Sequence, residues 1–93
     1  MENLVFSQLK YLGYKITTGQ VRENGIDFVA EKTDEKAYFQ VTYLLTSKKV
    51  IRREFGNLLK IKDNYPKYVI SMDDYVKGGF KGIKHLNLID FLI

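Results

Sequence analysis

The sequence predicts a single α/β domain built on a mixed β-sheet. Three observations favour this fold class. The chain opens with a segment of helical period, three short β-rich segments follow with connections too short for a helix, and a second helical segment precedes a fourth β-rich segment. Strands joined by short turns pair antiparallel, whereas strands joined through a helix pair parallel. With 93 residues the chain is long enough for one domain, and 45% apolar residues can form its core.

The N-terminal half is expected to hold one helix and three strands. Residues 2–12 repeat apolar side chains at helical spacing, and Gly13 ends that helix. Turn signals at residues 24–25 (Asn-Gly) and 33–35 (Thr-Asp-Glu) separate the strands into a meander. A helix that begins at the first residue without a capping side chain favours a domain that belongs to a longer polypeptide. The expected strands cover residues 14–18, 26–31 and 36–43.

The C-terminal half is expected to add a crossover helix, two strands and a last helical turn. Thr46 or Ser47 can cap the helix, which runs to about Lys62 along an apolar stripe. A strand over 67–72 should then lie parallel to the third strand, because a helical crossover joins the two. A short strand at 83–86 and a turn capped by Asn87 complete the order αβββαβ(β)α.

Charge and composition limit the classes of function. Residues 1–43 carry five Lys/Arg against six Asp/Glu, whereas residues 44–93 carry ten against five, so the second half is basic and can attract a polyanion. The alternative is a solvated basic face without a specific partner. No Cys is present, which excludes disulfides and thiolate metal sites. Because no apolar run is long enough to span a bilayer and no signal peptide is recognisable, we expect a cytoplasmic protein without a membrane partner.

The expected order of elements is that of the restriction-endonuclease-like fold, also called the PD-(D/E)XK core. That fold holds an acid on its first helix, an Asp at its second strand and an acid-x-Lys on its third, and the carboxylates gather a divalent cation. Glu2, Asp27, Gln40 and Thr42 stand at these positions, and Gln40 and Thr42 share one side of their strand. Thr42 replaces the Lys, so the pattern predicts the remnant of a nuclease site. Glu2 and Asp27 are the candidate ligands for weak Mg²⁺ binding.

Each of these residues also has an ordinary structural interpretation. An acid such as Glu2 is favourable near a helix N-terminus, and Asp27 can bond to the preceding Asn-Gly turn. Gln40 and Thr42 can be residues of a half-exposed sheet face. The single His, His85, is expected to be structural or at the surface, and without Cys or a second His a zinc site is not expected.

Several segments in order resemble one known family. They are ENLVFSQL, GIDFVAE, YFQVTYLL, IRREFGNLLKIKDNYPKYVISMDD and GIKHLNLIDFLI. Together they resemble the C-terminal domain, of unknown function, of a large group of prokaryotic AAA-type P-loop ATPases. The resemblance covers essentially the whole chain. It implies a restriction-endonuclease-like fold, and a preceding ATPase module in cis that would bind the ATP. This chain itself contains no P-loop motif.

The leading hypothesis is therefore a non-catalytic, nuclease-like accessory domain of an ATPase that binds DNA or another partner. Its nucleic-acid contacts would come from the basic helix, through Lys48, Lys49, Arg52 and Arg53. One alternative is an active metal-dependent nuclease with a displaced lysine, for which Lys36, Lys48 and Lys49 are candidates. Another is a structural or homo-oligomerising tail without a nucleic-acid role, favoured if Tyr11, Tyr43 and Tyr75 are exposed.

Overall fold

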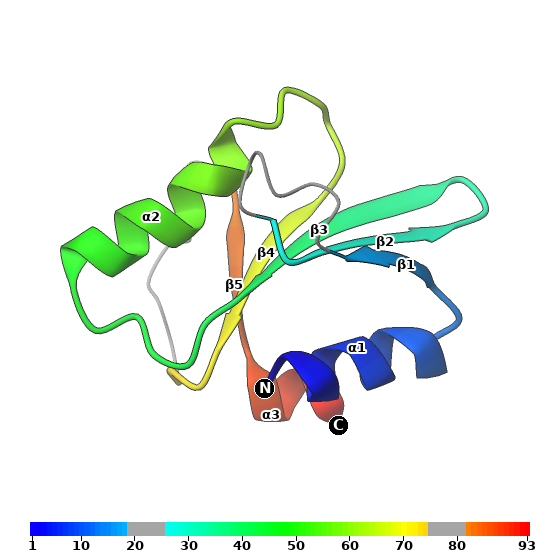
Figure 1. Cartoon of the computed structure of the whole chain (residues 1–93), viewed down its shortest axis with the longest axis horizontal. Helices are drawn as coiled ribbons and strands as arrows, with labels where there is room; N and C mark the ends of the chain where they lie inside the picture. The colour runs from blue at the N-terminus through cyan, green and yellow to red at the C-terminus, as the bar shows by residue number, and fades with distance from the viewer. Residues whose placement is uncertain (19–25, 75–81) are drawn as a thin grey trace.

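The computed structural model describes residues 1–18, 26–74 and 82–93, which form an α/β fold (Figure 1). In this part of the chain a five-stranded mixed sheet is accompanied by three helices. None of these helices has the length and apolar character needed to cross a bilayer. In chain order the elements are α1 (Glu2–Tyr11), β1 (Lys15–Thr18), β2 (Phe28–Lys32), β3 (Glu35–Val41), α2 (Lys48–Leu59), β4 (Lys67–Ser71), β5 (Lys84–Asn87) and α3 (Leu88–Leu92).

The strands lie in the order β1-β2-β3-β4-β5, which puts β3 at the centre of the sheet. β1, β2 and β3 pair antiparallel, as the short turns predict, and the β2–β3 turn places Asp34 at a φ of +62°. β4 pairs parallel with β3 and β5 parallel with β4. The predicted mixed sheet and helical crossover are thus confirmed. The predicted turn at residues 24–25 lies outside the described residues.

Helices cover both faces of the sheet, with α1 and α3 on one face and α2 on the other (Figure 1). Successive side chains of β3 point to opposite faces of the sheet, so each face has its own hydrophobic core. Phe39 and Val41 pack with Val5 and Leu9 of α1, whereas Tyr38 packs with Phe55 of α2. Gln40 shares the side of Tyr38 because the side-chain period of a strand is two. A polar side chain is therefore buried in the core beneath α2.

The helix ends have local causes. Gly13 adopts a φ of +94°, a left-handed conformation that suits glycine, directly after α1. Ser47 caps α2, because its hydroxyl accepts a hydrogen bond from the backbone N–H of Val50. The predicted end at Lys62 is late by one turn: Lys60 and Ile61 donate to carbonyls three residues earlier, so the last turn tightens and the helix stops at Leu59.

Candidate functional site

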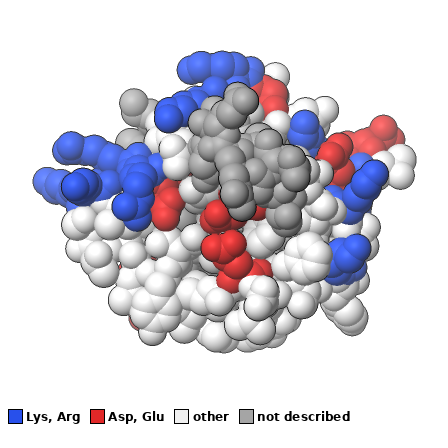
Figure 2. All heavy atoms as spheres, in the orientation of Figure 1, with Lys and Arg blue, Asp and Glu red and all other residues white. Residues whose placement is uncertain are grey.

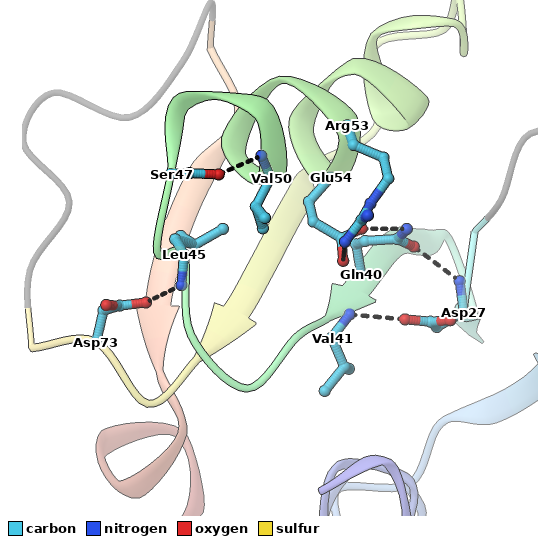
Figure 3. Close-up of polar contacts among 9 residues, drawn as sticks. All are labelled: Asp27, Gln40, Val41, Leu45, Ser47, Val50, Arg53, Glu54 and Asp73. Atoms are coloured by element: carbon cyan, nitrogen blue, oxygen red, sulfur yellow. Dashed lines mark hydrogen bonds and ion pairs between the residues drawn. The ribbon is translucent and has the colours of Figure 1, made fainter.

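A chain of hydrogen bonds links the start of β2, the end of β3 and the middle of α2 (Figure 3). Gln40 lies at its centre. The side-chain oxygen of Gln40 accepts from the backbone N–H of Asp27 at 3.0 Å, and its amide nitrogen donates to Glu54 Oε2 at 3.0 Å. Asp27 Oδ2 in turn accepts from the backbone N–H of Val41 at 2.8 Å. We call Asp27, Gln40 and Glu54 the polar network.

Local structure places each member of the polar network. Glu54 lies three residues after Ile51 and four before Leu58, so helical spacing turns it toward the sheet among apolar neighbours. Gln40 and Glu54 are only 4% and 8% exposed. A buried amide and a buried carboxylate are costly unless they are hydrogen-bonded, and here each satisfies the other. The network is therefore part of the packing between α2 and β3.

Asp27 carries the perturbed charge of the network. Its pKa is raised to about 6. Burial is the largest cause, the bond from the Val41 N–H opposes it, and the charges of Glu2 and Glu54 add to the rise. An acid with a pKa near 6 changes its charge close to neutral pH. The polar network therefore brings negative charges close together, and a proton bound by Asp27 reduces the repulsion between them.

One cation reaches this network from the same helix. Arg53 Nη2 lies 3.8 Å from Glu54 Oε1, and the Arg53 side chain is 61% exposed (Figure 3). The guanidinium is always charged and stands at the edge of the network, next to solvent. It therefore joins the buried acids to the exposed basic surface of α2.

A second polar cluster fixes the loop that leads into α2. Asp73 Oδ2 accepts from the backbone N–H of Leu45 at 2.7 Å and from the Ser71 hydroxyl at 2.8 Å (Figure 3 shows the Leu45 bond). His85 Nε2 lies 2.6 Å from the same hydroxyl oxygen, so Nε2 must carry the hydrogen of that bond. Burial lowers the pKa of His85, and the charge of Asp73 opposes this effect.

This serine, histidine and aspartate do not form a nucleophilic triad. In such a triad the histidine stands between the other two residues and takes the proton of the serine. Here Ser71 stands in the middle, and its side chain is fully buried. The cluster is therefore a structural clamp at the carboxyl ends of β4 and β5.

The structure brings together two of the four residues predicted for a nuclease-like site. Asp27 and Gln40 are hydrogen-bonded to each other. Glu2 lies exposed in the first turn of α1, and its charge raises the pKa of Asp27. Thr42 is half-buried just after β3, where its N–H bonds to the Ile70 carbonyl.

Sequence reasoning missed Glu54, although a signal was present. An acid flanked at helical spacing by Ile51 and Leu58 is expected to face the core, where it needs a partner. The three lysines proposed as a displaced catalytic group also have definite places. Lys36 stands at the far end of β3, with its Nζ over the rings of Tyr38 and Tyr65. Lys48 and Lys49 are exposed in the first turn of α2.

A relative exists in Haemophilus influenzae. It is named "Uncharacterized protein" and is 37% identical over 93 residues, which are 100% of this chain. The match spans 22% of the relative's length, so the relative is a much longer polypeptide. No family model and no solved structure matches the chain. The similarity to the Haemophilus relative extends over the whole domain and not just over one motif.

A nuclease-like site implies a divalent cation held by several oxygen ligands. Within residues 1–18, 26–74 and 82–93, no three acidic, His or Cys side chains converge on one point. The oxygen of Gln40 accepts from Asp27 N–H, and Asp27 Oδ2 accepts from Val41 N–H, so both already bond to the backbone. A weak Mg²⁺ site held by Asp27 and Glu2 stays a prediction, and we derive no chemical step through one.

A basic surface covers the N-terminal half of α2. Figure 2 shows lysine and arginine side chains gathered there. Its four members, all exposed, are Lys48, Lys49, Arg52 and Arg53. We call them the basic face. Since they come from two successive turns of one helix that packs on the sheet, they form a fixed array of positive charge.

Proposed function

We propose that this domain is a non-catalytic, nuclease-like accessory module that binds nucleic acid through the basic face. The observation that carries the proposal is the array of four exposed cations on one capped, packed helix. A clustered basic patch is the electrostatic footprint typical of proteins that bind phosphate backbones, and counterion release strengthens that binding. As the family resemblance implies, the module would serve an AAA-type ATPase, with ATP bound outside this domain.

The order of elements supports the nuclease-like part of the proposal. α1, a three-stranded meander, a crossover through α2 and a parallel β4 follow the order of the restriction-endonuclease-like core. Asp27 at the start of β2 and Gln40 on β3 stand where that core keeps two of its polar groups. Fold alone does not imply activity, so the site residues decide the functional part of the proposal.

The polar network supports the non-catalytic part. Thr42 stands where the nuclease core keeps a lysine, and a threonine hydroxyl is neither a base near neutral pH nor a fixed positive charge. Gln40 contributes a neutral amide, and its amide N–H donates a hydrogen bond to Glu54 in the core. Both positions thus lack the charges that phosphate hydrolysis uses, and Gln40 bonds instead to Glu54 of α2.

The test is fluorescence anisotropy with a labelled DNA duplex at several salt concentrations. We expect weak, sequence-independent binding. The logarithm of the binding constant should fall linearly with the logarithm of the salt concentration, with a slope of about −0.9 per neutralised phosphate. The double variant Lys49→Glu/Arg52→Glu should lose this binding and leave the polar network intact, because neither residue contacts it. Reversal at Arg52 and Arg53 should have the same effect on binding.

The matched control reverses two charges away from α2. Lys10→Glu/Lys15→Glu makes the same change in net charge at exposed positions of α1 and β1. If binding reflected net charge alone, the two double variants would lose affinity equally. Equal affinity of the wild type and the Lys49→Glu/Arg52→Glu variant would contradict the proposal.

A further inference from the structure

Charged and apolar side chains are segregated on the surface of this domain. In the orientation of Figure 2 the charged side chains lie toward α2 and the sheet, whereas the opposite side is almost free of them. The segments 1–14 and 87–93 build that side, and their charged residues are Glu2, Lys10 and Asp90. Apolar side chains stand exposed instead. Leu4, Tyr11, Leu12, Ile89 and Ile93 are 51%, 84%, 42%, 48% and 93% exposed, and we call them the α1–α3 face.

Helical geometry joins these residues into one surface. Leu4, Gln8 and Tyr11 follow one stripe of α1, at positions i, i+4 and i+7. The side-chain amide of Gln8 donates to the Phe91 carbonyl of α3 at 3.2 Å, which sets that stripe beside α3. A continuous exposed apolar patch of this kind marks an interaction surface, whereas scattered apolar residues do not.

A hollow that suits a large side chain borders this face at Leu12. The cavity has a volume of about 420 Å³ and is lined mainly by apolar and aromatic groups, including Tyr14, Phe39, Tyr68 and Phe91, with Glu35 and Lys36 also in its lining. The rings of Phe39 and Tyr68 stack with centroids 5.2 Å apart and form one wall. Protein interfaces commonly place one large side chain in such a pocket and surround it with apolar contacts.

We propose that the α1–α3 face is the docking surface for the additional module of a longer polypeptide, of the kind that the Haemophilus relative represents. This chain spans 22% of that relative, so most of the relative lies outside the domain. Both ends of the domain lie at this face (Figure 1), and a chain that continued from either end would leave from it. The module would present an uncharged, apolar surface with a large side chain for the hollow.

The area of the apolar surface and the effective concentration of a tethered partner favour a module of the same polypeptide over a second copy of this chain. A stable complex between free proteins needs about 800 Å² from each partner, more than the exposed side chains of the α1–α3 face provide. A tethered module is held at an effective concentration in the millimolar range, so a smaller apolar patch is sufficient to keep it docked. This inference is independent of nucleic-acid binding, because the α1–α3 face and the basic face lie on opposite sides of the sheet.

The test measures the accessibility of single cysteines to a bulky maleimide, which is practical because this chain contains no cysteine. Cysteine replaces Tyr11 in one variant and Ile89 in another, with Tyr43→Cys, 66% exposed and outside the face, as the matched control. In the full-length Haemophilus relative, cysteine likewise replaces, one at a time, the residues aligned with these three positions. All other cysteines of the relative are first removed.

In this chain all three cysteines should react quickly. In the relative, cysteines at the positions of Tyr11 and Ile89 should react about tenfold or more slowly than the cysteine at the position of Tyr43. Equal rates at the three positions of the relative, whether all fast or all slow, would overturn the proposal. Protection of Tyr11→Cys in this chain that grows with its own concentration would also overturn it, because a second copy would then be the occupant.

Discussion

At the scale of single residues, Asp27 stands out because the fold makes its charge unfavourable. Its pKa of about 6 lies above the ordinary value of 3.8, chiefly through burial. Between those two values the folded chain binds more protons than the unfolded chain, so the free energy of unfolding falls as pH rises. The penalty is absent below about pH 3.8 and complete above about pH 7. Asp27 thus reduces stability near neutral pH.

Asp27→Asn should therefore stabilise the protein at pH 7.5 and have little effect at pH 4. Asparagine keeps an oxygen to accept the Val41 N–H and removes the charge. After a discount for the partial exposure of Asp27, the gain should be about 1 kcal/mol. Urea unfolding at both pH values measures it, with Asp34→Asn in the exposed β2–β3 turn as the control. A gain of equal size at pH 4 and 7.5 would contradict the assigned cause.

Gln40 is the residue on which the polar network depends. Gln40→Glu replaces the donor to Glu54 with a second carboxylate, so two acids face each other in the core. We expect a loss of about 2–3 kcal/mol at pH 7, reduced at pH 5 as one carboxyl takes a proton. The double variant Gln40→Glu/Glu54→Gln restores one donor and one acceptor and should recover most of the loss in urea unfolding. No recovery would show that the bond seen between these side chains contributes little to stability.

At the scale of elements, side-chain period was sufficient to predict the helices and strands, because both cores depend on it. The predicted strand 36–43 includes all of β3 except Glu35, and the predicted helix to Lys62 includes all of α2. The boundaries were less predictable, since they depend on individual backbone bonds such as those of Lys60 and Ile61.

Part of the site was also readable from the sequence. Asp27 and Gln40 were predicted from element order, and the structure shows them bonded. Glu54 was missed because its role depends on which face of α2 meets β3, and that is a tertiary property. The clamp of Ser71, Asp73 and His85 joins residues from separate segments, so no local pattern could predict it.

The start of α2 offers a prediction at this scale. The sequence left Thr46 and Ser47 open as caps, and the structure assigns the role to Ser47, whose hydroxyl accepts from Val50 N–H. Ser47→Ala should lower the free energy of unfolding by about 1 kcal/mol. Thr46→Ala, at the exposed neighbouring position, is the matched control and should change little. Thermal or urea unfolding checks both, and an equal loss in the two variants would contradict the assignment.

At the scale of the whole molecule, the sheet separates two surfaces of different chemistry. α2 presents the basic face on one side, and α1 with α3 presents an apolar face on the other. A domain arranged in this way can hold a polyanion and a protein neighbour at the same time without competition between them. The polar network lies between α2 and the sheet, where it stabilises the helix that carries the charges.

The same arrangement predicts that the domain does not cleave nucleic acid with Mg²⁺ or Mn²⁺. Hydrolysis of a phosphodiester needs a positioned group for proton transfer and a positive charge for the transition state. Thr42 supplies neither, and Lys36 is held over two tyrosine rings at the other end of β3. Loss of a proton-transfer group reduces rates by about 10²–10⁴-fold, and loss of an electrostatic stabiliser by about 10²–10³-fold.

The losses of the proton-transfer group and of the electrostatic stabiliser are not strictly additive. Together they should nevertheless reduce the rate of cleavage below what a routine assay detects. A long plasmid-nicking assay compares the wild type with Asp27→Ala, each with Mg²⁺ and with Mn²⁺. Both proteins should leave the supercoiled plasmid intact. Nicking by the wild type that disappears in Asp27→Ala would falsify the prediction, because it would require a working metal site at the polar network and a lysine that moves into it. Nicking of equal rate in both proteins would instead indicate a contaminating nuclease, since Asp27 is the acid on which any metal site in the network would depend.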